Sequence, residues 1–204
     1  MEKLNLEEIK QSNTKKLAKE IEYFEEIPST HLYAKNIALN EKQDGKFIFA
    51  EAQTAGIGTK GRSWYTGKGK NIAMTLILKP KCNIEQLSGL TVAIAECMKQ
   101  TIFELYGYKL VIKEPNDLLL NNKKICGILT EINTMGEDIN YLLISLGMNI
   151  NEENFSDETK NLATSLKKEY GVDFSREKII ARFLEKLERI YFRYSSLLKL
   201  LLIK

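Results

Sequence analysis

Short apolar runs separated by turn-forming residues dominate the middle of the chain. Each run has the length of a β-strand and is bounded by Gly, Pro, Asn or Asp, the residues that most often interrupt regular structure. Pro115 cannot donate a ladder hydrogen bond, so it separates one strand from the next. The pattern predicts strands at residues 23–27, 47–51, 72–79, 109–113, 118–120, 125–132 and 139–150.

Other segments carry apolar residues at helical spacing. They predict helices at residues 31–41 and 84–106, a short helix beginning at residues 163–166, and another helix beginning at residues 173–177. Gly107 follows the long stripe of the second helix and is expected to cap it. Ser29 and Thr30 precede the first helix, where hydroxyl groups accept from the free N–H groups of the first turn. The combination predicts an α+β fold, a mixed, largely antiparallel sheet with helices packed on it.

The two ends of the chain differ from this middle region. Residues 1–20 are rich in Lys and Glu, which indicates a solvated helix or a partly disordered segment too short for a helix-turn-helix domain. Residues 197–204 are unusually apolar for a terminus. We therefore divide the chain into a charged segment (1–20), one catalytic-type domain (21–196) and an apolar tail (197–204).

Composition narrows the class of protein. The 204 residues are 44% hydrophobic and 28% charged, and the net charge of +3 is too balanced to indicate a general nucleic-acid surface. Cys82, Cys97 and Cys126 lie far apart without a C-x-x-C motif, which argues against a structural zinc site and for a reducing compartment. The charged N-terminus is not a signal peptide, and no apolar run reaches the ~18 residues of a transmembrane helix. These features predict a globular protein of the cytoplasm that has no membrane partner.

The clearest candidate for ligand binding is the stretch Gln53-Thr54-Ala55-Gly56-Ile57-Gly58-Thr59-Lys60-Gly61-Arg62-Ser63-Trp64. Glycines allow close approach of the backbone to a ligand, and Lys60 and Arg62 suit an anion. The stretch formally matches G-x-G-x-x-G, but more glycines and a strand follow it where a dinucleotide site requires a helix. A Rossmann site is therefore disfavoured, and a mobile hairpin loop with incidental cations is the alternative interpretation.

Polar residues at strand ends form further candidates. Asn116 and Asp117 follow a proline, Lys124 lies on the partner strand of the same hairpin, and Asn149 ends the last strand. Asp117 has the hard oxygen ligand that Mg²⁺ prefers, although turn chemistry alone also explains an Asn-Asp pair. His31, the only histidine, has no partner evident in the sequence.

These segments, taken together and in this order, resemble the catalytic domain of biotin protein ligases, within the biotin/lipoyl ligase superfamily. The resemblance runs from about residue 23 to residue 194 and implies the class II synthetase-like fold of that superfamily. The matching segments are Pro28-Ser29-Thr30, Gln53-Thr54-Ala55-Gly56, Gly58, Gly61-Arg62-Ser63-Trp64, Gly69-Lys70-Asn71, Pro115-Asn116-Asp117, Lys124–Glu131, Gly147–Asn151 and Ala163–Leu166.

The resemblance implies an enzyme that joins biotin and ATP to biotinoyl-5′-AMP and then transfers biotin to one lysine of a biotin carboxyl carrier domain. It implies that Mg²⁺ takes part, with Lys124 and Arg62 as catalytic residues. The implied biotin-binding residues are Ser29, Thr30, Gln53, Gly56, Lys124 and Gly127. The implied ATP- and adenylate-binding residues are Gly58, Gly61, Arg62, Trp64, Asn116, Asn149 and Thr164, and the implied metal ligands are Asp117 and Asn149.

The sequence also departs from the family pattern. Ile57 and Thr59 stand where the family loop usually has arginines, and Glu114 replaces the usual tryptophan before Pro-Asn-Asp. His31 replaces an asparagine, and Ser145 replaces a glycine. Each lost loop cation removes charge-assisted contacts worth roughly 1.5–3 kcal/mol. We therefore expect weaker holding of the adenylate, and an enzyme that is slow or that releases biotinoyl-AMP onto nearby lysines.

Two alternative functions share the same fold. One is a ligase or acyltransferase that handles lipoate or octanoate, and the other is a degenerate binder of biotin or a nucleotide without catalysis. The family's small C-terminal β-domain and the DNA-binding domain of some members do not fit this length, so neither that β-domain nor a DNA partner is expected. A homodimer remains open.

Overall fold

A seven-stranded sheet forms the centre of the structure, a computed structural model that describes residues 3–201 and the side chains of residues 3–194. The strands are β1 (Ile21–Phe24), β2 (Phe47–Ala50), β3 (Ile72–Leu78), β4 (Val111–Lys113), β5 (Asp117–Leu120), β6 (Lys123–Met135) and β7 (Asp138–Met148). They lie in the order β1-β2-β3-β7-β6-β5-β4, and all neighbours are antiparallel except β1 and β2. This confirms the predicted mixed, largely antiparallel sheet.

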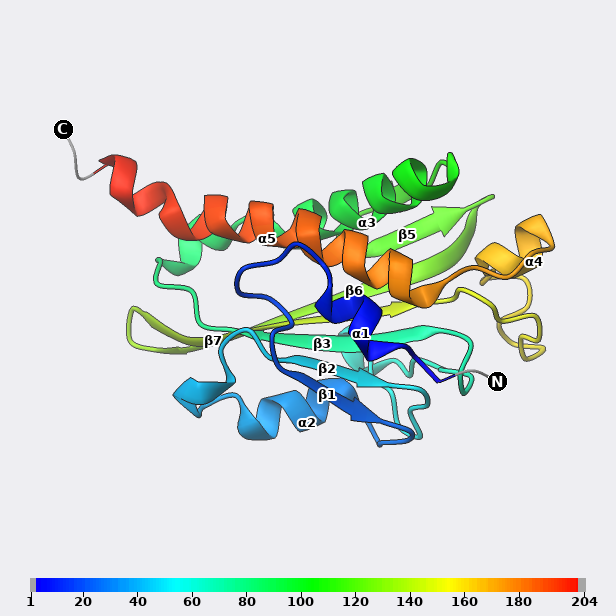
Figure 1. Cartoon of the computed structure of the whole chain (residues 1–204), viewed down its shortest axis with the longest axis horizontal. Helices are drawn as coiled ribbons and strands as arrows, with labels where there is room; N and C mark the ends of the chain where they lie inside the picture. The colour runs from blue at the N-terminus through cyan, green and yellow to red at the C-terminus, as the bar shows by residue number, and fades with distance from the viewer. Residues whose placement is uncertain (1–2, 202–204) are drawn as a thin grey trace.

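Helices cover both faces of this sheet (Figure 1). The α-helices are α1 (Leu6–Lys10), α2 (Thr30–Ile37), α3 (Leu90–Tyr106), α4 (Leu166–Tyr170) and α5 (Arg176–Leu201), and the 3₁₀ turns are η1 (Glu41–Gln43), η2 (Thr59–Gly61) and η3 (Ile84–Leu87). Figure 1 shows α1, α3 and α5 on one face and α2 on the other. The α+β class is therefore confirmed.

The two faces of β2 show why its sequence is a continuous apolar run. Alternate side chains of a strand point to opposite faces. Phe47 and Phe49 belong to the large core that includes residues of α3 and α5, whereas Ile48 packs with Ala34 of α2 on the other face. Because both faces are buried, the strand has no polar positions, and the chain that leaves it toward Gln53 starts from a rigid support.

The helices differ from the predicted ones at their ends. The helix predicted at residues 84–106 is interrupted, because Gly89 adopts φ +76° between η3 and α3, a conformation that L-residues rarely take. Gly107 caps α3 with φ +77°, as predicted. The first helix ends at Ile37 and not near residue 41, because Asn40 accepts a hydrogen bond from Lys42 N–H and begins η1.

Residues 3–20 are not the solvated segment that their composition predicts. Leu4, Ile9 and Leu17 are buried, and α1 packs against α5. Glu188 of α5 accepts hydrogen bonds from consecutive backbone N–H groups at residues 15–17, at 2.7–2.9 Å. We call residues 3–20 the N-terminal strap. The periodicity missed it because isolated apolar residues, not a stripe, anchor it.

The last part of the chain continues the long helix α5. The apolar tail predicted at residues 197–204 begins inside α5, which runs to Leu201, and residues 202–204 lie outside the described part. Within residues 3–201, no helix combines the length and the apolar character needed to cross a membrane.

Candidate active site

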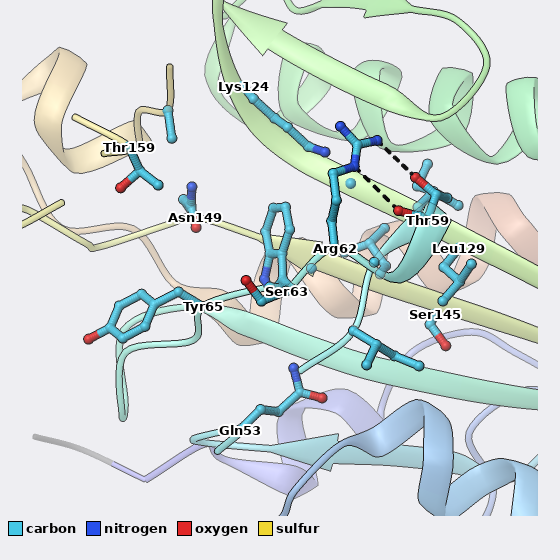
Figure 2. Close-up of a pocket in the computed structure, with 18 of the residues that line it drawn as sticks. Gln53, Thr59, Arg62, Ser63, Tyr65, Lys124, Leu129, Ser145, Asn149 and Thr159 are labelled. Carbon is cyan, nitrogen blue, oxygen red and sulfur yellow. Dashed lines mark hydrogen bonds between the residues drawn. The ribbon is translucent and has the colours of Figure 1, made fainter. Parts of the chain in front are cut away.

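A pocket of about 640 Å³ lies between the sheet and the loops that follow β2 and β7. Figure 2 shows Gln53 and Ser145 on one side of it and Lys124, Asn149 and Thr159 on the other. We call the first side the hydroxyl end, which consists of Ser29, Thr30, His31, Gln53 and Ser145. We call the second side the loop end, which consists of residues 57–64, Lys124, Asn149 and residues 154–163.

Gln53 is the central side chain of the hydroxyl end. Its Oε1 accepts from Thr30 N–H at 2.9 Å and from the Thr30 hydroxyl at 3.2 Å, while its Nε2 donates to Thr66 Oγ1 at 3.2 Å. Ser29 is the N-cap of α2, with its Oγ accepting from Leu32 N–H. The start of α2 and the loop after β2 are thus joined directly at the pocket wall.

His31 has partners that lie far away in the sequence. The ring is 4% exposed, with Nδ1 at 2.8 Å from Ser145 Oγ and Nε2 at 3.1 Å from Glu131 Oε2. Glu131 also forms an ion pair with Lys35 Nζ at 3.0 Å. Two departures from the family pattern, at positions 31 and 145, therefore contact each other. That coincidence of departures was the only sequence signal for this network.

The glycine loop folds back on itself in this structure. Gly58 N–H donates to Arg62 O at 2.7 Å, and Trp64 N–H donates to Gly56 O at 2.8 Å. Arg62 donates from Nε to Thr59 O and from Nη2 to Thr59 Oγ1, the two dashed lines in Figure 2. Thr59, which stands where the family loop usually has an arginine, is thus the hydrogen-bond partner of Arg62.

Trp64 packs against two glycines of the sheet. A Cβ built on Gly147 would lie 2.3 Å from indole atoms of Trp64, and one built on Gly127 would lie 3.1 Å away. Lys124 Nζ lies 5.4 Å from the indole centroid, a cation–π distance. A side chain at position 147 would therefore displace the indole, which forms a wall of the pocket, whereas one at position 127 would need a small shift. The indole Nε1 is buried and has no hydrogen-bond partner among the described residues.

Lys124 is fixed through both its backbone and its side chain. Its N–H donates to Leu162 O at 2.8 Å and its carbonyl accepts from Thr164 N–H at 2.9 Å. Its Nζ lies 2.7 Å from Asp117 Oδ1. That oxygen is fully buried and makes no directional hydrogen bond among the described residues, so the contact is an ion pair held by charge. Lys124 is the cation that the structure presents to the pocket from β6.

The structure brings most of the predicted site residues to this pocket. Those that line it are Ser29, Thr30, Gln53, Gly58, Arg62, Trp64, Asn116, Lys124, Gly127 and Asn149. Those that do not line it are Gly56, Gly61, Asp117 and Thr164. Thr164 is fully buried, its hydroxyl bonds Glu169, and its carbonyl accepts from Asn149 Nδ2 at 3.1 Å. Its direct contact with a nucleotide stays a prediction.

Residues 154–162 supply a wall that the sequence analysis missed, because they form a loop without a motif, and Ala163 of the matching segment Ala163–Leu166 continues this wall. The members that line the pocket are Asn154, Phe155, Ser156, Glu158, Thr159, Leu162 and Ala163. Buried Glu152 anchors this loop by accepting from Lys70 Nζ and from Asn154 N–H. Within the described residues, no group of three or more His, Cys, Asp or Glu side chains is placed to hold a metal ion.

Comparisons with known proteins agree on one family. A model of the biotin/lipoate A/B protein ligase family matches residues 23–149. The bifunctional ligase/repressor BirA of Bacillus subtilis is 34% identical over 185 residues, which are 90% of this chain and 57% of that protein. The BirA of Escherichia coli is 27% identical over 161 residues, 79% of this chain and 50% of that protein. The chain thus spans about half the length of these curated relatives.

Solved structures show the same fold. The biotin protein ligase of Leishmania major in complex with biotinyl-5-AMP has a TM-score of 0.70 and 25% identity, covering 89% of this chain and 78% of that one. The biotin protein ligase of Aquifex aeolicus in complex with biotin and ATP has a TM-score of 0.73 and 24% identity, covering 88% of this chain and 73% of that one.

Proposed function

The chain belongs to the biotin/lipoate A/B protein ligase family, and from this premise we propose that it ligates biotin to a lysine of a biotin carboxyl carrier domain through biotinoyl-5′-AMP. The observation that carries the proposal is a continuous pocket that joins a row of hydrogen-bonding side chains to a lysine fixed at its other end. The biotin protein ligase of Leishmania major has been solved with the same intermediate bound, which supports the proposal by analogy.

The hydroxyl end suits the ureido ring of biotin. A ureido group has one carbonyl acceptor and N–H donors in a fixed plane. Ser29, Thr30 and Gln53 offer hydroxyl and amide groups for these atoms at the pocket wall. An apolar acyl head would leave the remaining lone pairs and hydrogens of these groups without partners, which disfavours the lipoate and octanoate alternative.

Lys124 is assigned to the reacting centre. A biotin carboxylate oxygen attacks the α-phosphorus of ATP, the bond to pyrophosphate breaks, and a mixed anhydride forms. The acceptor lysine then attacks the carbonyl carbon, and AMP leaves with the electron pair of the broken bond. Two anions must meet in the first step, so a lysine that exchanges its contact with Asp117 for the α-phosphate lowers the barrier electrostatically.

Asp117 offers the hard carboxylate oxygen that Mg²⁺ prefers, and its Oδ1, which pairs with Lys124 at 2.7 Å, would become available to a metal when Lys124 turns to the α-phosphate. A bound Mg²⁺ would neutralise phosphate charge on ATP, and Asp117 with the amide oxygen of Asn149 are the groups that we assign to hold it. Thr164 positions Asn149, since its carbonyl accepts from the Asn149 amide.

Trp64 and the glycine loop cover the intermediate. The indole against Gly127 and Gly147 closes one side of the pocket, and Figure 2 shows Arg62 of the glycine loop bonded to Thr59 at the pocket. Exclusion of water limits hydrolysis of the mixed anhydride.

We also propose the setting in which the protein acts. The partner is a biotin carboxyl carrier domain, and the net charge of +3 gives no support to a DNA partner. Cys82, Cys97 and Cys126 are free and buried, which suits the reducing cytoplasm.

The test is biotin-dependent exchange between ATP and pyrophosphate, with lipoate and octanoate in parallel. We expect exchange with biotin only, followed by labelling of one lysine on a carrier domain. Exchange that depends on lipoate or octanoate instead of biotin would identify that acid as the substrate. Binding of biotin without any exchange would identify a non-catalytic binder.

A further inference from the structure

An unbroken line of hydrogen bonds runs from the pocket into the sheet and out to Glu131. It links Gln53, Thr30, Thr75, Ser145, His31 and Glu131 in that order, at 3.2, 3.0, 2.8, 2.8 and 3.1 Å. Thr75 is fully buried on β3 and does not line the pocket. It connects the pocket wall to the histidine without touching the pocket itself.

The donor-to-acceptor direction of these hydrogen bonds is set at Gln53, whose Oε1 accepts from a backbone N–H group. Gln53 Oε1 accepts from Thr30 N–H, so the facing Thr30 hydroxyl, also bonded to Oε1, must be a donor. A hydroxyl has one hydrogen, so the contact between Thr75 and Thr30 requires Thr75 to donate.

Counting the hydroxyl hydrogens in the same way gives the direction of the bonds from Thr75 to His31. Because Thr75 has spent its hydrogen on Thr30, Ser145 must donate to Thr75. Ser145 has then spent its own hydrogen, so His31 Nδ1 must carry a proton and donate to Ser145. Each step follows from the one before it.

The other ring nitrogen faces a carboxylate. Burial opposes ionisation of Glu131, yet hydrogen bonds from Lys35 and His31 hold its pKa below the usual value. A carboxylate only accepts, so His31 Nε2 must donate as well. His31 faces Glu131 of β6, and the other titratable or charged groups that contact Glu131 are Lys35 from α2 and Tyr141 from β7.

The direction determines what the pocket offers to a ligand. The Thr30 hydroxyl hydrogen is directed to Gln53, which leaves a Thr30 lone pair as an acceptor. Gln53 Nε2 has one hydrogen bonded to Thr66 and a second one left as a donor. In the reverse direction, the oxygens of Thr30 and Gln53 would face each other with lone pairs, and Gln53 would lose this bond.

We propose that His31 is a positioning residue that donates from both ring nitrogens and thereby directs this line of hydrogen bonds toward Gln53, so that the hydroxyl end selects a ureido ring. The selection of a ureido ring rests on the function proposed above. The donation from both nitrogens does not, because it follows from contacts within the protein alone.

The test uses the fact that His31 is the only histidine in the chain. In untagged, ¹⁵N-labelled protein, its imidazole nitrogens can be read by NMR without assignment. We expect protons on both nitrogens in the folded protein. A neutral ring with its proton on Nε2 would show that the line runs in the reverse direction and would overturn the proposal.

A matched pair at Thr75 tests whether the line, and not burial alone, sets this state. T75V keeps the shape but removes the hydroxyl, so Ser145 becomes free to donate to Nδ1, and we expect the neutral ring with its proton on Nε2. T75S keeps the hydroxyl, and we expect the wild-type spectrum. S145A removes the Nδ1 partner by a different route and should also give the neutral ring. Wild-type spectra in T75V and S145A would refute the relay.

The same variants connect the line to the proposed reaction. In the exchange assay, T75V should raise the KM for biotin roughly two- to tenfold with little change in kcat, the size expected for one neutral hydrogen bond. T75S should restore the KM. If T75V changes the protons on the His31 ring but leaves the KM for biotin unchanged, the line of hydrogen bonds has no role in selecting biotin. Absence of exchange in the wild type would instead refute the proposed function and leave the NMR result standing.

Discussion

At the hydroxyl end of the pocket, each polar side chain has a protein partner, whereas at the loop end the Arg62 guanidinium bonds, among the described residues, only to its neighbour Thr59. Ser29, Thr30 and His31 are 1–4% exposed, and Tyr65 beside the loop is 69% exposed. One end is thus fixed before a ligand arrives. At the other end, Arg62 contacts Thr59 and Lys124 contacts Asp117, and we expect a bound anion to replace these contacts.

This difference separates the two tasks of the pocket. A preorganised set of donors and acceptors loses little entropy on binding and rejects a ligand that leaves its members unpaired. In the proposed reaction, the exposed loop would admit ATP and the acceptor and then close over the intermediate. Selectivity is therefore expected at the hydroxyl end, and catalytic rate and retention of the intermediate at the loop end.

The largest effect should come from Lys124 at the loop end. K124A removes the positive charge that β6 presents to the pocket, and we expect kcat for exchange to fall about 10²- to 10³-fold, as for other lost transition-state contacts. K123A, on the same strand but outside the pocket, is the matched control. Normal exchange by K124A would exclude Lys124 from the reacting centre.

The next effect concerns the glycines beneath Trp64. The added Cβ of G147A would lie 2.3 Å from the indole, so the ring and its loop must move. We expect kcat/KM for ATP to fall roughly tenfold or more, since misplaced groups lose much of their contribution. Fluorescence of Trp64, the only tryptophan, should change in parallel.

G127A gives a graded comparison for the indole, because its Cβ would lie 3.1 Å from the same ring, although it would also lie 3.2–3.3 Å from the end of the Lys124 side chain. Its effect on Trp64 fluorescence, which does not depend on Lys124 catalysis, should be smaller than that of G147A. Equal effects, or an unchanged Trp64 spectrum in G147A, would show that the indole does not depend on the glycine surface.

The contrast between these residues shows what a sequence can and cannot reveal. Strands such as Ile72–Leu78 were predictable because a run buried on both faces consists mainly of apolar residues. The glycine loop and Lys124 were predictable because glycine and charge are unusual at such positions. The partners of His31 were not, because Ser145 and Glu131 are 114 and 100 positions away and only the order of the strands brings them together.

A substitution at Ile57 tests whether a cation at the loop end helps the protein to retain biotinoyl-AMP. Ile57 lines the pocket without a charge, where the family pattern has an arginine. I57R adds a cation, and we expect labelling of a bystander protein relative to a carrier domain to fall roughly two- to tenfold, the range for a hydrogen bond to a charged group in a partly exposed site. Thr59 is less suitable, because it already bonds Arg62.

I57Q is the control for side-chain length without charge. If I57Q lowers bystander labelling as much as I57R does, volume and not charge sets retention. If the wild-type protein labels only the carrier lysine at a normal rate, the expected release of biotinoyl-AMP is wrong.

The smallest effect on activity should come from the N-terminal strap, which supports the hydroxyl end from behind. Leu4 N–H and Tyr23 donate to Glu51, which also pairs with Arg176 of α5 and lies close to Gln53 in the chain. Burial opposes ionisation of Glu188, yet the N–H groups of residues 15–17 lower its pKa. A folded-state pKa below the ordinary value of 4.5 gives stability that is present above that pH and is lost as the pH falls through the folded value.

E188Q should therefore lower the free energy of unfolding by about 1–3 kcal/mol at pH 7, because charge-assisted bonds to backbone N–H groups are weakened. The difference from the wild type should shrink as the pH falls through the folded-state pKa of Glu188, since the wild-type carboxyl then becomes protonated too. Urea denaturation at pH 7 and at a series of acidic pH values measures this, with exposed Glu85→Gln as the control. The KM for biotin should rise less in E188Q than in T75V, because the strap acts on the position of β2 while Thr75 acts on the hydrogen bonds themselves. A larger rise in E188Q would mean that the rigidity of the hydroxyl end comes from the strap and not from its own network.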